Sequence, residues 1–273
     1  MGGLIKTQLK LLSKSRSLIV CMVIAMALGI TMTLIYNYFW EQRGDKIAMS
    51  YALMRQYGMN TQLLDTALSS IPRNNLWSYI NIFFSDGAIW LISCCCASSF
   101  LSCEYTMGTL KNPVSRGCGR RQIYLAKYIA GIIDVFLIAL SYVGAGTVTA
   151  LFVVQRTASV GAGDIVLIII CYILLLAAMA AFFMLLTVMF HRTGFSAAAA
   201  IAGPMLISSL LNVIAAVNES ASSLSRYLLM ESFITVEQSV LNGEAYITII
   251  TAATYIIICS TAGYIIFNRS EIK

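Results

Sequence analysis

The run Ile165–Phe190, IVLIIICYILLLAAMAAFFMLLTVMF, contains no charged side chain and decides the class of fold. It is long enough to cross the hydrocarbon core of a bilayer, which takes about 20 apolar residues in a helix. Its apolar residues follow one another and do not alternate with polar ones, which indicates a helix and argues against a barrel strand. The run therefore predicts a transmembrane helix.

Runs of the same kind lie on both sides of it and leave little chain for anything else. The six predicted spans are 18–39, 80–101, 128–154, 165–190, 196–217 and 246–267. The composition agrees, because 59% of the residues are hydrophobic and only 11% are charged, which a soluble globular domain does not show. We expect an all-α membrane protein with one transmembrane domain, 1–273, and with both termini on the same side.

The distribution of cations gives the expected orientation. Twelve of the 18 lysines and arginines lie in the N-terminal tail, between the second and third spans, between the fourth and fifth, and after the sixth. Cytoplasmic segments carry such an excess of cations. We therefore expect a multi-pass protein with both termini in the cytoplasm, and we interpret the net charge of +6 as a result of this topology and not of nucleic-acid binding.

Three segments outside the spans have helical patterns. In 1–17, leucines recur at helical spacing while lysines lie on another face, which favours an amphipathic helix on the membrane surface in contact with lipids. A basic tail that only sets the topology is the alternative. Apolar residues recur in the outer segment 218–245, which favours short re-entrant helices. The long outer segment 40–79 is also expected to hold short helices.

The eight cysteines predict neither a disulfide nor a metal site. Six lie inside predicted spans, where a thiol behaves as a small apolar residue. Cys103 and Cys118 face a reducing cytoplasm in the predicted topology, and no C-x-x-C spacing occurs. We expect no metal and no catalytic residue in this chain.

Two carboxylates, Asp86 and Asp134, lie within predicted spans, where ionisable groups are candidates for function. An intramembrane hydrolase that uses both is one alternative function. Their predicted depths differ by about 10 Å at 1.5 Å per residue, which argues against a pair that shares a proton. An ion-coupled secondary carrier is another alternative, but Gly203-Pro204 has no counterpart in the first three spans.

The sequence predicts neither a catalytic histidine nor a phosphate-binding loop. The one histidine, His191, lies beside Arg192 at the inner end of the fourth span, and we interpret the two as a basic pair that sets the topology. A phosphate-binding G-x-x-x-x-G-K-[ST] loop is absent from the sequence, so the chain is not expected to bind ATP by that device.

One polar, basic and turn-rich segment, Cys103–Lys127, interrupts the apolar pattern between the second and third spans. It reads CEYTMGTLKNPVSRGCGRRQIYLAK, with Glu104, then Gly108-Thr109-Leu110, then Pro113, then Ser115-Arg116. In this it resembles the ABC-2 type permease family, whose six-helix subunits carry an E-x-x-x-G-T-L segment and a basic stretch at the same place. The resemblance implies that 103–127 forms a coupling helix that docks on a cytosolic ATPase, and a loop that only sets the topology is the alternative.

The same resemblance implies a function and a set of partners. The chain would be the transmembrane subunit of a type V-like ABC exporter in a bacterial plasma membrane. It would not be an enzyme by itself. It would bind no cofactor, because ATP and Mg would bind two separate ABC ATPase subunits. A second permease copy or a sister permease would complete the pore, and the substrate would be hydrophobic or amphipathic, such as a peptide, an antibiotic or a toxin.

The resemblance also assigns residues to roles. ATPase coupling falls to Glu104, Tyr105, Gly108, Thr109, Leu110, Pro113 and Arg116. The translocation path, which the family places between the first, second and fifth spans, falls to Asn81, Asp86 and Trp90. Small residues at four-residue spacing in the fifth span allow close approach of a neighbouring helix, and Pro204 is expected to kink it. The residues assigned to subunit packing are Ala198, Ala199, Ala202, Gly203 and Pro204.

Overall fold

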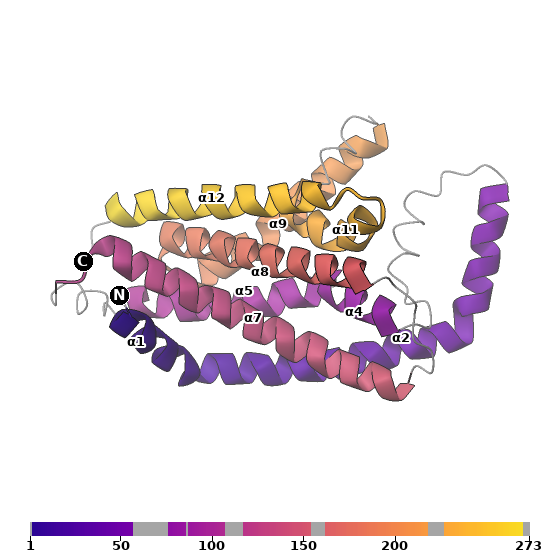
Figure 1. Ribbon diagram of the computed structural model, residues 1–273, viewed down its shortest axis with the longest axis horizontal. Helices are drawn as coiled ribbons and strands as arrows, with labels where there is room; N and C mark the ends of the chain where they lie inside the picture. The colour runs from indigo at the N-terminus through magenta and orange to yellow at the C-terminus, as the bar shows by residue number, and fades with distance from the viewer. Residues whose placement is uncertain are drawn as a thin grey trace.

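The computed structural model describes residues 2–56, 76–85, 87–106, 117–153, 162–217 and 227–269. Within these ranges every element is a helix and no strand occurs, which confirms the predicted all-α class. Most of the helices run along one direction and form an elongated bundle (Figure 1). The helices are α1 (Gly2–Ser13), α2 (Arg16–Gln56), α4 (Leu76–Ser85), α5 (Gly87–Thr106), α7 (Arg120–Val153), α8 (Ala162–Phe190), α9 (Thr193–Val217), α11 (Leu229–Leu241) and α12 (Ala245–Arg269).

The lengths and compositions of these helices are those of a multi-pass membrane protein. Five described stretches can cross a membrane unbroken, namely Arg16–Tyr38, Arg120–Val153, Gly163–Phe190, Thr193–Leu211 and Ala245–Arg269. The predicted span 80–101 falls on a bent pair instead, Tyr79–Ser85 and Gly87–Cys103, with an angle of 47° between its halves. The described residues therefore contain five candidate spans, or six when the bent pair counts as one.

The first span is part of a much longer helix than the sequence pattern indicates. α2 has 41 residues and continues to Gln56, so that 40–56 extends the span and does not form separate short helices. At 1.5 Å per residue it is about 60 Å long, twice the hydrocarbon core of about 30 Å. Its second half extends away from the bundle (Figure 1). The rest of the outer segment 40–79, up to residue 75, lies outside the described residues.

Two glycines allow α2, α7 and α4 to pack closely. A Cβ atom at Gly29 of α2 would lie 2.5 Å from the carbonyl oxygen of Tyr142 on α7. A Cβ atom at Gly146 of α7 would lie 2.5 Å from the Phe83 ring of α4. Thr33 Oγ1 also donates a hydrogen bond to the Gly146 carbonyl oxygen at 3.2 Å. Small residues thus bring three helices into close contact, as is usual inside membranes.

The two ends of the bundle differ in what they carry. α1 and the C-terminal end of α12 lie at the same end, together with the C-terminal end of α5 and the first turn of α7 (Figure 1). α1 packs against α7, with Leu12 and Gln8 buried and with Lys6 and Lys10 at its surface. At the opposite end, α11 lies within the predicted outer segment 218–245 and packs against α8 and α12.

Candidate functional site

The predicted coupling segment begins in the last turn of α5. Glu104 and Tyr105 belong to this turn, and the structure describes the side chain of Tyr105 but not that of Glu104. Arg120 begins α7 on the other side of the segment. The remaining predicted coupling residues, Gly108, Thr109, Leu110, Pro113 and Arg116, lie outside the described residues. The structure therefore describes this site only at its two ends, in the last turn of α5 and from residue 117 onward.

The Tyr105 ring is in contact with three other parts of the chain at this end of the bundle. The ammonium of Lys127, on α7, lies 4.7 Å from the centre of the ring. The His191 ring, between α8 and α9, meets it edge-on with 4.9 Å between centroids. The Phe267 ring, near the end of α12, meets it edge-on at 6.5 Å. We call Tyr105, Lys127, His191 and Phe267 the Tyr105 cluster.

Lys127 is the charged member of this cluster, and it is almost completely enclosed. Its side chain is 2% exposed, and Phe267 is fully buried. The face of an aromatic ring attracts a cation most strongly where water is excluded, with a contribution of about 2 kcal/mol. The sequence pattern suggested a topological role for Lys127, as the last residue of a basic loop. The structure places it inside the protein, against the first residue after Glu104.

His191 has a backbone conformation that side-chain-bearing residues rarely adopt. Its φ is 54°, in the left-handed region, which costs such a residue about 1–2 kcal/mol. α8 ends at Phe190 and α9 begins at Thr193, so this conformation turns the chain between two long helices. The His191 N–H donates a hydrogen bond to the Thr187 carbonyl oxygen at 3.0 Å. The turn places the imidazole against the Tyr105 ring. The interpretation of His191 as a cation that sets the topology did not include this contact.

A second link joins the start of α7 to the end of α12. Arg120 Nη1 donates a hydrogen bond to the Asn268 carbonyl oxygen at 2.6 Å. The carbonyl groups in the last turn of a helix have no partner within the helix, and a guanidinium group satisfies them well. Both flanks of the predicted coupling segment therefore hold α12, one through Tyr105 and Phe267 and the other through Arg120.

The predicted path residues lie toward the other half of the bundle. Trp90 and Asn81 are each 5% exposed. The Trp90 indole N–H donates to the Ala200 carbonyl oxygen of α9 at 2.9 Å, and the Tyr172 hydroxyl of α8 donates to Asn81 Oδ1 at 3.4 Å. Within one chain both side chains thus hold helices together. Asp86 lies outside the described residues, and the path assignment stays a prediction.

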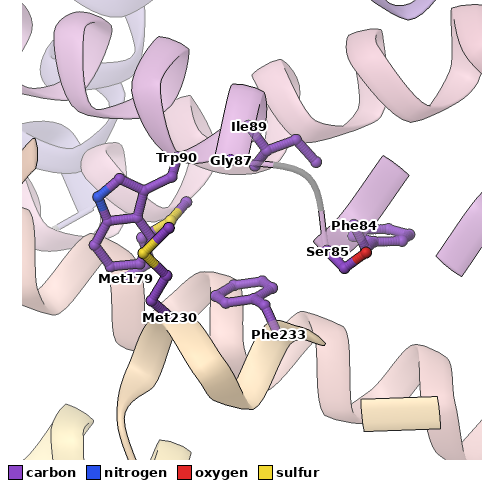
Figure 2. Close-up of a pocket in the computed structure, with 8 residues that line it drawn as sticks. All are labelled: Phe84, Ser85, Gly87, Ile89, Trp90, Met179, Met230 and Phe233. Carbon is purple, nitrogen blue, oxygen red and sulfur yellow. The ribbon is translucent and has the colours of Figure 1, made fainter. Parts of the chain in front are cut away.

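A partly open pocket lies beside Trp90, between the adjoining ends of α4 and α5 on one side and α8 and α11 on the other (Figure 2). Met179 and Met230 lie next to the indole, and the Phe233 ring faces it from α11 (Figure 2). The Phe233 and Trp90 rings meet edge-on at 6.5 Å. The lining is formed by Phe84, Ser85, Gly87, Ile89, Trp90, Met179, Met230 and Phe233. Such aromatic and thioether surfaces suit apolar groups of varied shape.

The small residues of the fifth span lie mostly on the outside of the chain. Ala198 and Ala202 are exposed, and Ala199, Gly203 and Pro204 are partly exposed. A Cβ atom at Gly203 would meet nothing within 4 Å. α9 is assigned as one helix from Thr193 to Val217 with Pro204 inside it. The predicted packing face is thus at the surface of the single chain.

The second intramembrane carboxylate, Asp134, is fully buried on α7 and contacts the thiol of Cys96 on α5. Its proposed partner in a hydrolase, Asp86, lies outside the described residues. All eight cysteines lie among the described residues, and none of them forms a disulfide. In the part of the chain that the structure describes, no three His, Cys, Asp or Glu side chains gather where they could hold a metal ion.

Comparison with known proteins identifies the family of this chain but assigns it no activity. Residues 30–273 match a family model described as "Protein of unknown function (DUF2705)". The match covers most of α2 and all later helices, including the Tyr105 cluster and the pocket. No curated protein matches the chain.

Proposed function

The chain belongs to the DUF2705 family, and we propose that it is the transmembrane subunit of an ATP-driven exporter in a bacterial plasma membrane. In this proposal it has the six-span architecture of ABC-2 permeases, with both termini in the cytoplasm. It does not hydrolyse ATP itself. Two cytosolic ABC ATPase subunits bind ATP and Mg, and they dock on the segment between α5 and α7.

The observation that carries the proposal is the position of Tyr105. This residue precedes the Gly108-Thr109-Leu110 motif by three positions in the sequence and touches α7, the α8–α9 turn and α12 at once. A partner that displaces the segment therefore pulls on three other parts of the bundle. A loop that served only to set the topology would need its cations, but it would need neither the buried Lys127 nor the ring contacts.

The surface at this end supports an acidic partner. Arg121 and Arg192 are exposed, and so are the lysines of α1. Under the proposed orientation these cations face the cytoplasm, where they are available to carboxylates of the ATPase and to lipid phosphates. Exposed ion pairs contribute little affinity, so their main effect is on encounter and orientation. The binding energy then has to come from the segment between Thr106 and Gly117.

The other half of the bundle supports an apolar cargo and a second permease. The pocket between Trp90 and Phe233 is lined mainly by aromatic and thioether groups, which suit a hydrophobic or amphipathic peptide, antibiotic or toxin. Ala198 and Ala202 leave one face of α9 open to close approach. In the proposal, a second copy or a sister permease packs against this face, and the substrate passes between the two subunits.

The test is to co-express the chain with a candidate ABC ATPase from the same genome, and to measure co-purification and ATP hydrolysis in lipid. We expect Leu110→Asp to lower the recovered ATPase at least about tenfold, because a buried carboxylate in an interface removes a binding hot spot. Tyr105→Ala is expected to leave the ATPase bound and to lower substrate-stimulated hydrolysis. Tyr246→Ala is the control, since Tyr246 is 59% exposed at the opposite end of α12. Hydrolysis that is unchanged by Leu110→Asp contradicts the coupling role.

A further inference from the structure

Asp134 is a carboxylic acid in the middle of α7 that the proposed transport mechanism does not use. Its side chain is fully buried. One carboxylate oxygen, Oδ1, is 3.2 Å from the Cys96 sulfur on α5. The other oxygen, Oδ2, is buried and has no hydrogen-bond partner among the described residues. A carboxylate with one unpartnered oxygen is a costly group to enclose between apolar helices when it carries a charge.

A short series of polar contacts leads from Asp134 to the edge of the bundle. The Cys96 sulfur lies 3.8 Å from the Ser17 hydroxyl oxygen at the start of α2. The Ser17 and Ser99 hydroxyl oxygens are 2.6 Å apart, and the Ser99 hydroxyl donates to the Cys96 carbonyl oxygen at 2.8 Å. Cys96 is 1% exposed, whereas both serines are partly exposed. The series therefore joins a buried acid to two partly exposed hydroxyl groups, one of them at the start of α2.

The groups that face Asp134 carry no compensating charge. Cys96 of α5 and Cys21 of α2 are the titratable side chains that interact with it in the described part of the chain. Both are neutral thiols in an apolar environment. Lys127 lies on the same side of α7, but two turns away, which is about 10 Å along the axis. Its ammonium contacts the Tyr105 ring.

Burial favours the neutral acid over the carboxylate at this position. The Cys96 thiol donates to Oδ1, which accepts a hydrogen bond in either protonation state. The Ser99 hydroxyl donates to the Cys96 carbonyl oxygen, which leaves the Ser17 hydroxyl to donate to Ser99. When the proton is absent, the unpartnered oxygen Oδ2 carries part of a negative charge between apolar helices.

We propose that Asp134 is a proton-binding site inside the membrane, that the Cys96 thiol positions its carboxyl group, and that the Ser17–Ser99 pair is the route of the proton to water. The proton comes from water and returns to it, and no other bond changes. For the proton to leave, water has to reach the carboxylate, which requires α2 to separate from α5 at Ser17 and Ser99. The closed arrangement of α2, α5 and α7 is thus the protonated state. This inference does not depend on the ATP-driven transport proposed above.

Infrared spectroscopy of the full chain in lipid nanodiscs tests the site directly. At neutral pH we expect the carbonyl band of a protonated carboxylic acid, which is lost in Asp134→Asn. Asp164→Asn is the matched control and keeps the band, because Asp164 is exposed in the first turn of α8. Absence of the band from the wild-type protein, or its persistence in Asp134→Asn, overturns the proposal. Loss of the band when sodium replaces potassium at constant pH also overturns it, since the site would then hold a cation.

Substitutions of Cys96 and of its neighbour Cys95 test the role of Cys96 without removing the acid. This test remains possible if Asp134→Asn fails to fold. Cys96→Ala is expected to shift the frequency of the carbonyl band, because Asp134 Oδ1 loses its hydrogen-bond donor. Cys95→Ala is expected to leave the frequency unchanged, since Cys95 is exposed on the other side of α5. Equal frequencies in the wild-type protein and in Cys96→Ala contradict the proposed contact.

Discussion

The ammonium of Lys127 lies 4.7 Å from the centre of the Tyr105 ring, so the two ends of the predicted coupling segment, Cys103–Lys127, are in direct contact. The contact is enclosed, because Lys127 is 2% exposed. It joins the last turn of α5 to an early turn of α7. A force applied to Tyr105 therefore acts on α5 and α7 together and not on one helix alone.

A double-mutant cycle measures this contact. Tyr105→Leu and Lys127→Met each remove one side of it while keeping an apolar side chain of similar length. We expect a coupling energy of about 1–2 kcal/mol between the two positions, from thermal unfolding in one detergent. The pair Tyr246→Leu and Lys127→Met is the control, because Tyr246 lies at the far end of α12, and it is expected to be additive. Additivity at Tyr105 as well shows that the cation contributes nothing there.

Two glycine positions test the close approach of α2 and α7. Gly29→Ala places a methyl group 2.5 Å from a backbone oxygen, which has no rotamer to change, so the helices must move apart. We expect a loss of about 1–3 kcal/mol in the free energy of unfolding. Gly144→Ala on α7 is the matched control, because its methyl group meets nothing within 4 Å. That substitution is expected to be neutral or to stabilise the helix by about 0.5–1 kcal/mol.

The turn at His191 gives a prediction about backbone strain. Asparagine tolerates a positive φ, whereas a β-branched residue does not. Both His191→Asn and His191→Val remove the ring that contacts Tyr105. We therefore expect His191→Val to be less stable than His191→Asn by about 1–2 kcal/mol in the same unfolding assay. Equal stabilities of the two variants are incompatible with a left-handed turn at this position.

The exposed face of α9 gives a prediction about assembly. Ala202→Trp places a large side chain on the face that carries Ala198, where the single chain has room for it. We expect the variant to keep its own stability and to lose co-purification of a differently tagged permease subunit. Ile207→Trp is the control, because Ile207 is exposed but lies on a different side of the helix, about 140° away. Association that survives Ala202→Trp places the partner elsewhere.

The all-α class and most of the spans could be predicted because apolar runs of this length have few alternatives in a membrane. The bend between α4 and α5 and the extension of α2 to Gln56 could not, since hydropathy indicates where a helix is apolar and not where it bends or ends. Residues 40–56 are polar enough to read as a loop, yet they continue a helix that is already formed.

Tyr105 was predicted through a motif, but its contacts were not. Lys127 and His191 approach it from 22 and 86 positions further along the chain, and nothing in their local sequences indicates that they meet. The six cysteines within spans were interpreted as small apolar residues, and for Cys96 this was incomplete, because its thiol lies against Asp134. Contacts between helices depend on their rotation about the axis, which a continuously apolar span does not specify.

The contribution of α12 to the Tyr105 cluster has a consequence for biosynthesis. Helices enter the membrane in the order in which the ribosome makes them, so α5, α7 and α8 are present before Phe267 and the Asn268 carbonyl group arrive. Until then Tyr105 lacks one of its ring partners, and Arg120 has not yet capped α12. This end of the bundle is therefore completed late in translation, and a nascent chain that has not yet inserted α12 lacks the finished surface.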